Sequence, residues 1–252
     1  MTGGARDQIL ARIRAANRAA AHPSSPAADQ HADRDADAAY EALSRRYLRA
    51  HHDPAGHDIA ALFAERAADY RAVVERVPEP GPAALALAIA GILADRSAAA
   101  PGPFVVPDGL PAEWLAELPS GITLARDEPP LTAAELDQMS GVVTGCAVAI
   151  AETGTIILDH GSGQGRRALT LVPDFHLVVV RQDQIAADLA DAFARLDPAR
   201  PHTLISGPSA TSDIELIRVE GVHGPRNLHV LLTGSVFMIP KDPVLPAVPD
   251  PS

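Results

Sequence analysis

The spacing of apolar residues along the chain changes near residue 101. Before that point, apolar residues recur every three or four positions, which is typical of amphipathic helices. Helices are therefore expected over 5–20, 39–50, 56–76 and 82–96. The stretch between the first two is rich in Pro, Ser, Ala and Asp over 22–38. Because such a composition buries little apolar area, we expect a flexible linker there.

After residue 101, short β-rich runs alternate with helical segments. The expected strands cover 103–107, 121–125, 141–150, 155–159, 175–180, 202–206 and 227–234. A helix is expected between Asp183 and Leu196, with Asp183 as its N-cap. This alternation predicts an α/β fold with a mostly parallel sheet flanked by helices. The expected organisation is a helical region over 1–100, an α/β domain over 101–234 and a proline-rich tail over 235–252.

Composition and charge exclude several classes of protein. The 252 residues carry a formal charge of −11 and only 4% aromatic residues, which argues against a nucleic-acid partner. The single cysteine, Cys146, excludes a disulfide within the chain and a cysteine-ligated iron–sulfur or structural zinc site. The longest apolar run, 83–93, falls short of the roughly 20 residues that a membrane span needs, and the N-terminal segment lacks the apolar region of a signal peptide. A cytoplasmic protein without a membrane span is expected.

Glu152 is the strongest single candidate for chemistry. It lies between two apolar runs, so we expect it to be buried, with a raised pKa, in a loop at the carboxyl end of a strand. The alternative is a structural glutamate bonded to backbone amides or to an arginine. The loop at 206–215 offers small donors and a helix start near Ile214, which would attract an anion, although an ordinary capped turn has the same composition.

The remaining candidates are weaker. The glycine-rich loop at 161–167 has three glycines and two arginines, which suit an approaching anion. It matches neither a dinucleotide-binding nor a P-loop motif. The alternative interpretation is a plain β–α connection without a ligand. His176 and His223 lie beside apolar strands, where satisfied core histidines are the favoured interpretation. No His, Asp and Glu spacing indicates a metal site, and no nucleophile elbow is present.

Four segments together resemble a known family. They are CAVAIAETGTIIL, GRRALTLVPDFHLVVV, LISGPSATSDIE and GVHGPRNLHVLL, which lie in this order between residues 146 and 232. They resemble the lactate utilization protein C family (LutC/YkgG type, LUD domain), and the resemblance covers about 120–234. It implies a fold similar to the ribose-5-phosphate isomerase and CoA-transferase group. It also implies a part in oxidising L-lactate to pyruvate, as the subunit without iron–sulfur clusters beside partner proteins that carry them.

Within this resemblance we expect one pocket for a small carboxylate. Glu152 and His223 are its candidate catalytic residues, Glu152 as an anchor or acid/base and His223 as a donor. The candidate anion-binding residues are Thr153, Gly154, Thr155, Ser206, Gly207, Ser209, Asp213 and Gly224. Two other functions stay open: a stand-alone enzyme acting on a small phosphorylated or CoA-linked substrate, and a regulator or scaffold without a small-molecule site.

Overall fold

The computed structural model describes residues 5–20, 40–42, 58–77, 81–211, 219–220 and 223–234. The chain divides into two compact units, 1–48 and 49–252. The first contains helix α1 (Ala5–Ala20), on which Ile9 and Ile13 are exposed. The expected linker at 22–38, most of the expected helix at 39–50 and the tail at 235–252 lie outside the described residues.

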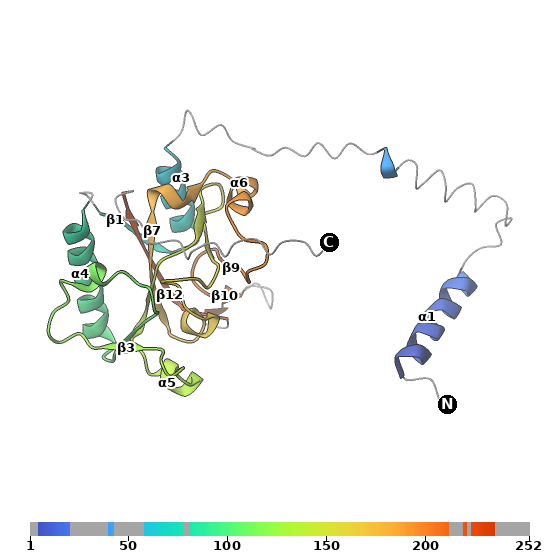
Figure 1. Cartoon of the computed structure of the whole chain (residues 1–252), viewed down its shortest axis with the longest axis horizontal. Helices are drawn as coiled ribbons and strands as arrows, with labels where there is room; N and C mark the ends of the chain where they lie inside the picture. Colours follow the sequence, from blue (N-terminus) through green and yellow to red (C-terminus); the bar gives the residue numbers. More distant parts are fainter. Residues whose placement is uncertain are drawn as a thin grey trace, which may run out of the picture. The chain divides into compact units, whose positions relative to one another are not determined.

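The second unit is built around a six-stranded sheet in which every neighbouring pair is parallel (Figure 1). Its strands in spatial order are β1 (Val73–Arg76), β12 (Asn227–Thr233), β7 (Phe175–Arg181), β4 (Gly141–Thr144), β2 (Phe104–Val106) and β3 (Leu124–Arg126). The central strands β7 and β4 are buried on both faces, as their continuous apolar sequences predict. The predicted α/β fold with a mostly parallel sheet is confirmed.

A second sheet of four strands packs against the first. Its order is β8 (Ile185–Ala186), β5 (Val148–Ile150), β6 (Thr155–Leu158) and β9 (Thr203–Ile205). β6 is antiparallel to both β5 and β9, whereas β8 is parallel to β5. A short antiparallel ribbon joins β10 (Ala210–Thr211) and β11 (Val219–Glu220).

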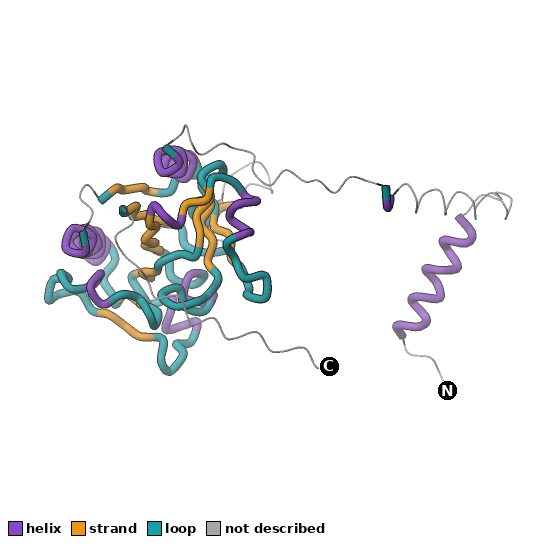
Figure 2. Tube along the Cα trace, turned by 45° about the horizontal axis from the view of Figure 1, so that its top comes forward, coloured by secondary structure: helices purple, strands orange, loops and turns teal. Residues whose placement is uncertain are grey.

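Helices cover the outer faces of these layers. One face of the large sheet packs on α4 (Pro82–Ala99) and the 3₁₀ turn η2 (Ala112–Leu115), through Leu85, Ile89 and Trp114. The other face packs on α3 (Ile59–Asp69) and on the second sheet. The far side of the second sheet carries α6 (Leu189–Ala194), and α5 (Ala133–Asp137) lies beside the 3₁₀ turn η3 (Arg167–Thr170). Figure 2 shows the strands gathered inside this unit with helices around them.

Helix α4 is the one described helix whose length and composition would allow it to cross a membrane. Its side chains Leu85, Ile89 and Leu93 are nevertheless fully buried against the large sheet. Since α3, β1 and α4 share two hydrophobic clusters with residues beyond 101, they belong to the same body as the predicted α/β domain.

The prediction of a helix over 56–76 is wrong for the last third of that range. α3 begins after the N-cap Asp58 and ends at Asp69, because Arg71 takes a left-handed backbone conformation with φ of 70°. The next residues form β1, whose backbone bonds to the parallel neighbour β12. Pairing in the sheet therefore overrides the helical spacing of Val74.

Two further predicted elements are divided in the structure. The run at 141–150 forms β4 and β5 in different sheets, because the chain turns at Gly145, whose N–H donates to the carbonyl of Gly163. The predicted helix at 183–196 is a 3₁₀ turn (η4, Gln182–Gln184), then β8, then α6. Its N-cap is Asp188 rather than Asp183, since the Asp188 carboxylate accepts from the Asp191 N–H at 2.8 Å.

Candidate functional site

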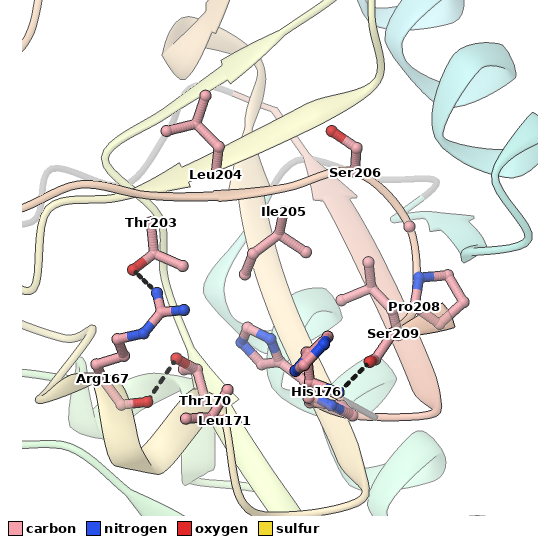
Figure 3. A pocket seen from close by; sticks show the side chains of 15 residues that line it. Arg167, Thr170, Leu171, His176, Thr203, Leu204, Ile205, Ser206, Pro208 and Ser209 are labelled. Atoms are coloured by element: carbon pink, nitrogen blue, oxygen red, sulfur yellow. Dashed lines mark hydrogen bonds between the residues drawn. The ribbon is translucent and has the colours of Figure 1, made fainter. Parts of the chain in front are cut away.

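A cleft of about 250 Å³ opens where the amino ends of β7 and β12 meet strand β9 and the loop that follows it (Figure 3). Its lining is a mixture of hydroxyl groups, two histidines, one arginine and a Gly-Pro turn. The polar side chains in it are Arg167, Thr170, His176, Thr203, Ser206, Ser209 and His223. In Figure 3, Arg167 and Thr203 lie toward one end of the opening and Ser209 toward the other.

The position of this cleft differs from the prediction. We expected a site at the carboxyl ends of parallel strands, but the cleft lies at the amino ends of β7 and β12. The reason is the second sheet, whose strand β9 delivers the 206–209 loop to this end. The Ser209 N–H donates to the Pro225 carbonyl at 2.8 Å, which fastens the loop to the segment before β12.

Arg167 supplies the positive charge of the cleft. It is the first residue of η3, and its Nη1 donates to Thr203 Oγ1 at 2.7 Å. No carboxylate among the described residues lies within ion-pair distance of it. Its neighbour Arg166 instead donates to both oxygens of Asp127, at 2.6 and 2.9 Å, and these bonds lower the pKa of Asp127. Of the two adjacent arginines, one is structural and the other faces the cleft.

His160 fixes the position of Arg167 through Thr203. Its backbone is left-handed, with φ of 58°, and its Nδ1 lies 3.0 Å from the Gly165 carbonyl. Because a carbonyl only accepts, Nδ1 must carry a proton. In the neutral ring, Nε2 then accepts from the Thr203 hydroxyl at 2.8 Å, and the same oxygen accepts from Arg167. The three side chains form one directed chain of hydrogen bonds.

The glycine-rich loop does not form an anion cradle. Asp159 already accepts from two groups of this loop, Gly161 N at 3.1 Å and Gln164 Nε2 at 2.7 Å, and also from Arg200 Nη1 at 2.8 Å. The loop amides of Gly163 and Gln164 donate to the carbonyls of Asp108 and Gly161. Burial raises the pKa of Asp159, but the bonds that it accepts outweigh burial and hold the pKa below its usual value. The loop's contribution to the cleft is therefore to carry Arg167.

His176 lies in the wall of the cleft and is fully buried. Its Nε2 is 2.7 Å from Thr144 Oγ1, while its Nδ1 has no hydrogen-bond partner among the described residues. The prediction of a satisfied core histidine therefore holds for only one ring nitrogen. Burial lowers the pKa of His176 to about 4, so the ring is neutral at pH 7.

Five of the predicted site residues do line this cleft: Ser206, Gly207, Ser209, His223 and Gly224. The Ser209 hydroxyl accepts from the His223 N–H at 2.9 Å, which joins the two loops. Gly207 has φ of 78°, and a Cβ there would lie 2.5 Å from the Tyr70 carbonyl oxygen, so only glycine fits. Asp213 lies outside the described residues.

Glu152, Thr153 and Gly154 do not line the cleft. They form the hairpin turn between β5 and β6, and the prediction that Glu152 is buried is wrong, because β5 ends at Ile150 and the turn leaves the side chain exposed. A Cβ on Gly154 would lie 2.4 Å from the Ala67 backbone nitrogen, so this glycine serves the contact with α3. Thr155 alone reaches the site, since its hydroxyl lies 2.8 Å from that of Ser206.

Metal and thiol chemistry find no support in this part of the chain. Among the described residues, no three His, Cys, Asp or Glu side chains come close enough to hold a metal ion. Cys146 is 3% exposed, and burial raises the pKa of its thiol to about 12.

Comparison with known proteins places this geometry in a family. Residues 123–233 match the LUD domain. The crystal structure of a DUF162 family protein from Deinococcus radiodurans is 45% identical, with a TM-score of 0.57, and the match covers 70% of this chain and 97% of that one. The chain belongs to the LUD domain family. The matched LUD region runs from β3 to β12 and so includes every described residue that lines the cleft.

Two curated relatives of this LUD chain differ in how much they share with it. "Lactate utilization protein C" from Deinococcus radiodurans is 58% identical over 134 residues, which cover 52% of this chain and 62% of the relative. "Uncharacterized protein YkgG" from Escherichia coli is 39% identical over 84 residues, which cover 30% and 36%. The chain thus matches less than two thirds of the length of either curated relative.

Proposed function

We propose that this LUD protein takes part in lactate utilization and that its cleft binds the carboxylate of a small 2-hydroxy or 2-oxo acid such as L-lactate or pyruvate. The names of several relatives support the first half of the proposal. The second half is supported by one observation: the Arg167 guanidinium faces the cleft without a carboxylate partner among the described residues.

The surroundings of Arg167 suit a carboxylate. A guanidinium binds a carboxylate through parallel hydrogen bonds, and hydroxyl groups can donate to the same oxygens. Ser206 supplies a hydroxyl in the same cleft, and the bond from Arg167 to Thr203 limits the motion of the arginine. A bound anion would therefore meet a positioned cation rather than a freely rotating side chain.

In this proposal, electron transfer in the oxidation of L-lactate to pyruvate belongs to iron–sulfur partner proteins. An iron–sulfur cluster is held mainly by several cysteine thiolates. This chain has one cysteine, and its thiol is buried with a raised pKa, so the residues present do not fit a cluster. The chain's own contribution would be to hold the organic acid.

Binding measurements on the Arg167→Met variant test the carboxylate site. Removing a charge-assisted bond of about 1.5–3 kcal/mol should weaken L-lactate and pyruvate binding by about tenfold or more in isothermal titration calorimetry. The matched control is Arg126→Met, which removes an exposed arginine whose ion pair with Asp108, at 3.8 Å, is outside the cleft. Equal affinity in all three proteins would overturn the site.

Two further measurements separate the proposal from the alternative of a stand-alone enzyme. Titration with ribose 5-phosphate and with coenzyme A should give no saturable binding, and binding of either one in place of lactate would favour that alternative. Purification of the tagged chain from cells grown on lactate should recover brown iron–sulfur proteins with it. A colourless chain that oxidises lactate alone would contradict the role of a subunit.

A further inference from the structure

We infer that His176 recognises the oxygen atom on C2 of the bound acid, and so gives the cleft a preference for 2-hydroxy and 2-oxo acids. The inference rests on the proposed carboxylate site, in which Arg167 holds the other end of the ligand. It concerns a residue that the sequence assigned to the core rather than to the site.

The geometry of His176 gives the first argument. It is the second residue of β7, it is fully buried, and it lines the same cleft as Arg167. Thr144 on the neighbouring strand β4 fixes the ring through Nε2 at 2.7 Å. Nδ1 has no partner among the described residues, although it too is buried. A buried polar atom without a partner is costly, and a ligand atom that bonds to it would remove that cost.

The chemistry of the ring gives the second argument. A neutral imidazole has one donor and one acceptor nitrogen, and the Thr144 hydroxyl can accept from Nε2 or donate to it. Nδ1 can therefore accept from a hydroxyl or donate to a carbonyl, depending on the tautomer. The pair of His176 and Thr144 is thus able to bind either the hydroxyl of lactate or the keto oxygen of pyruvate.

An acid without an oxygen on C2 should bind less well. Propionate would occupy the cleft with its carboxylate on Arg167 but leave Nδ1 facing a methylene group, which cannot pair with it. The loss of one hydrogen bond to a neutral group corresponds to about a five- to tenfold weaker affinity. The wild-type chain should therefore prefer L-lactate and pyruvate over propionate by about that factor in calorimetry.

Two variants assign the preference to His176. His176→Gln places an amide near the position of Nε2, so it can keep the bond to Thr144 while removing Nδ1, and the preference for lactate over propionate should fall below about twofold. Arg167→Met should weaken all three acids alike, because the carboxylate is common to them. Circular dichroism verifies that each variant is folded. If His176→Gln does not fold, Thr144→Val replaces it as the test: it removes the bond that fixes the His176 ring, and the preference for lactate over propionate should again fall.

The outcomes separate this inference from the proposed function. If the wild-type chain binds lactate and propionate equally, the assignment of His176 is overturned and the carboxylate site stands. If His176→Gln binds and keeps the full preference, another group recognises the C2 oxygen and the assignment is again overturned. If the wild-type chain binds none of the acids, the proposed carboxylate site fails and this inference fails with it.

Discussion

The hairpin turn at 151–154 and the wall of the cleft around His176 both place polar groups within apolar sequence, yet the structure uses them in opposite ways. In the turn, the glutamate points outward and the glycine is required by contact with α3. In the cleft, the histidine comes from the start of an apolar run and is buried with an unsatisfied nitrogen. The comparison shows that a polar residue between apolar neighbours indicates a site only when its side chain points inward.

The glycines of the two regions also serve packing. Gly154 and Gly207 both have positive φ, and a Cβ on either would overlap backbone atoms of the segment 66–70 at the end of α3. The two loops therefore rest on the same helix end, and the bond between Thr155 and Ser206 joins them. The turn therefore does not line the cleft; it packs against α3 and bonds, through Thr155, to the loop that does line it.

The largest expected effect is on stability, from Gly154→Ala. The added methyl would lie 2.4 Å from the Ala67 nitrogen in a left-handed conformation, so the free energy of unfolding should fall by about 2–4 kcal/mol in urea denaturation. The control is Gly91→Ala in α4, where nothing lies within 4 Å of the new Cβ and helix propensity predicts a gain of about 0.5–1 kcal/mol. A Gly154→Ala variant as stable as the wild type would show that the turn does not depend on this contact.

The next effect concerns pH and the buried His176. Its pKa is about 4 in the folded chain, whereas an unfolded histidine has a pKa of about 6.5. Between these values the unfolded chain binds more protons, so stability falls as the pH decreases. His176 should contribute a loss of roughly 2 kcal/mol between pH 7 and pH 5.

Urea denaturation at pH 7 and pH 5 measures this effect, with His176→Gln as the comparison. The variant should lose clearly less stability than the wild type on acidification. A remaining loss is expected from His229, because burial lowers its pKa as well. Identical losses in both proteins would mean that His176 does not titrate as a buried neutral ring.

The smallest effects separate the two regions by ligand binding. Ser206→Ala removes a hydroxyl that lines the cleft and bonds to Thr155, so affinity for lactate should fall about two- to fivefold.

Glu152→Gln changes an exposed residue of the turn, and both affinity and stability should stay near wild type, within about 0.5 kcal/mol. If Glu152→Gln lost lactate binding while Ser206→Ala kept it, the turn rather than the cleft would bind the ligand.

Much of the fold follows from local sequence patterns. Continuous apolar runs predicted β7 and β12, and the spacing in 82–96 predicted α4. Errors arose where pairing between distant strands decided the outcome. β1 forms at the end of a helical pattern because it pairs in parallel with β12. In the same way, β8 forms within a predicted helix because it pairs in parallel with β5. The sequence around β1 or β8 contains no trace of those partners.

For the candidate site, too, one part followed from the sequence and another part only from the tertiary structure. The sequence alone determined the motifs, the candidate residues Ser206, Gly207, Ser209, His223 and Gly224 and the presence of a single cysteine, since these depend on residue type and chain order. Only the tertiary structure decided that Arg167 and His176 share a cleft with those loops and that Glu152 does not. The physical reason is that burial and partnership arise when the second sheet packs on the first, and strand pairing between residues far apart in the chain sets which side chains face that contact.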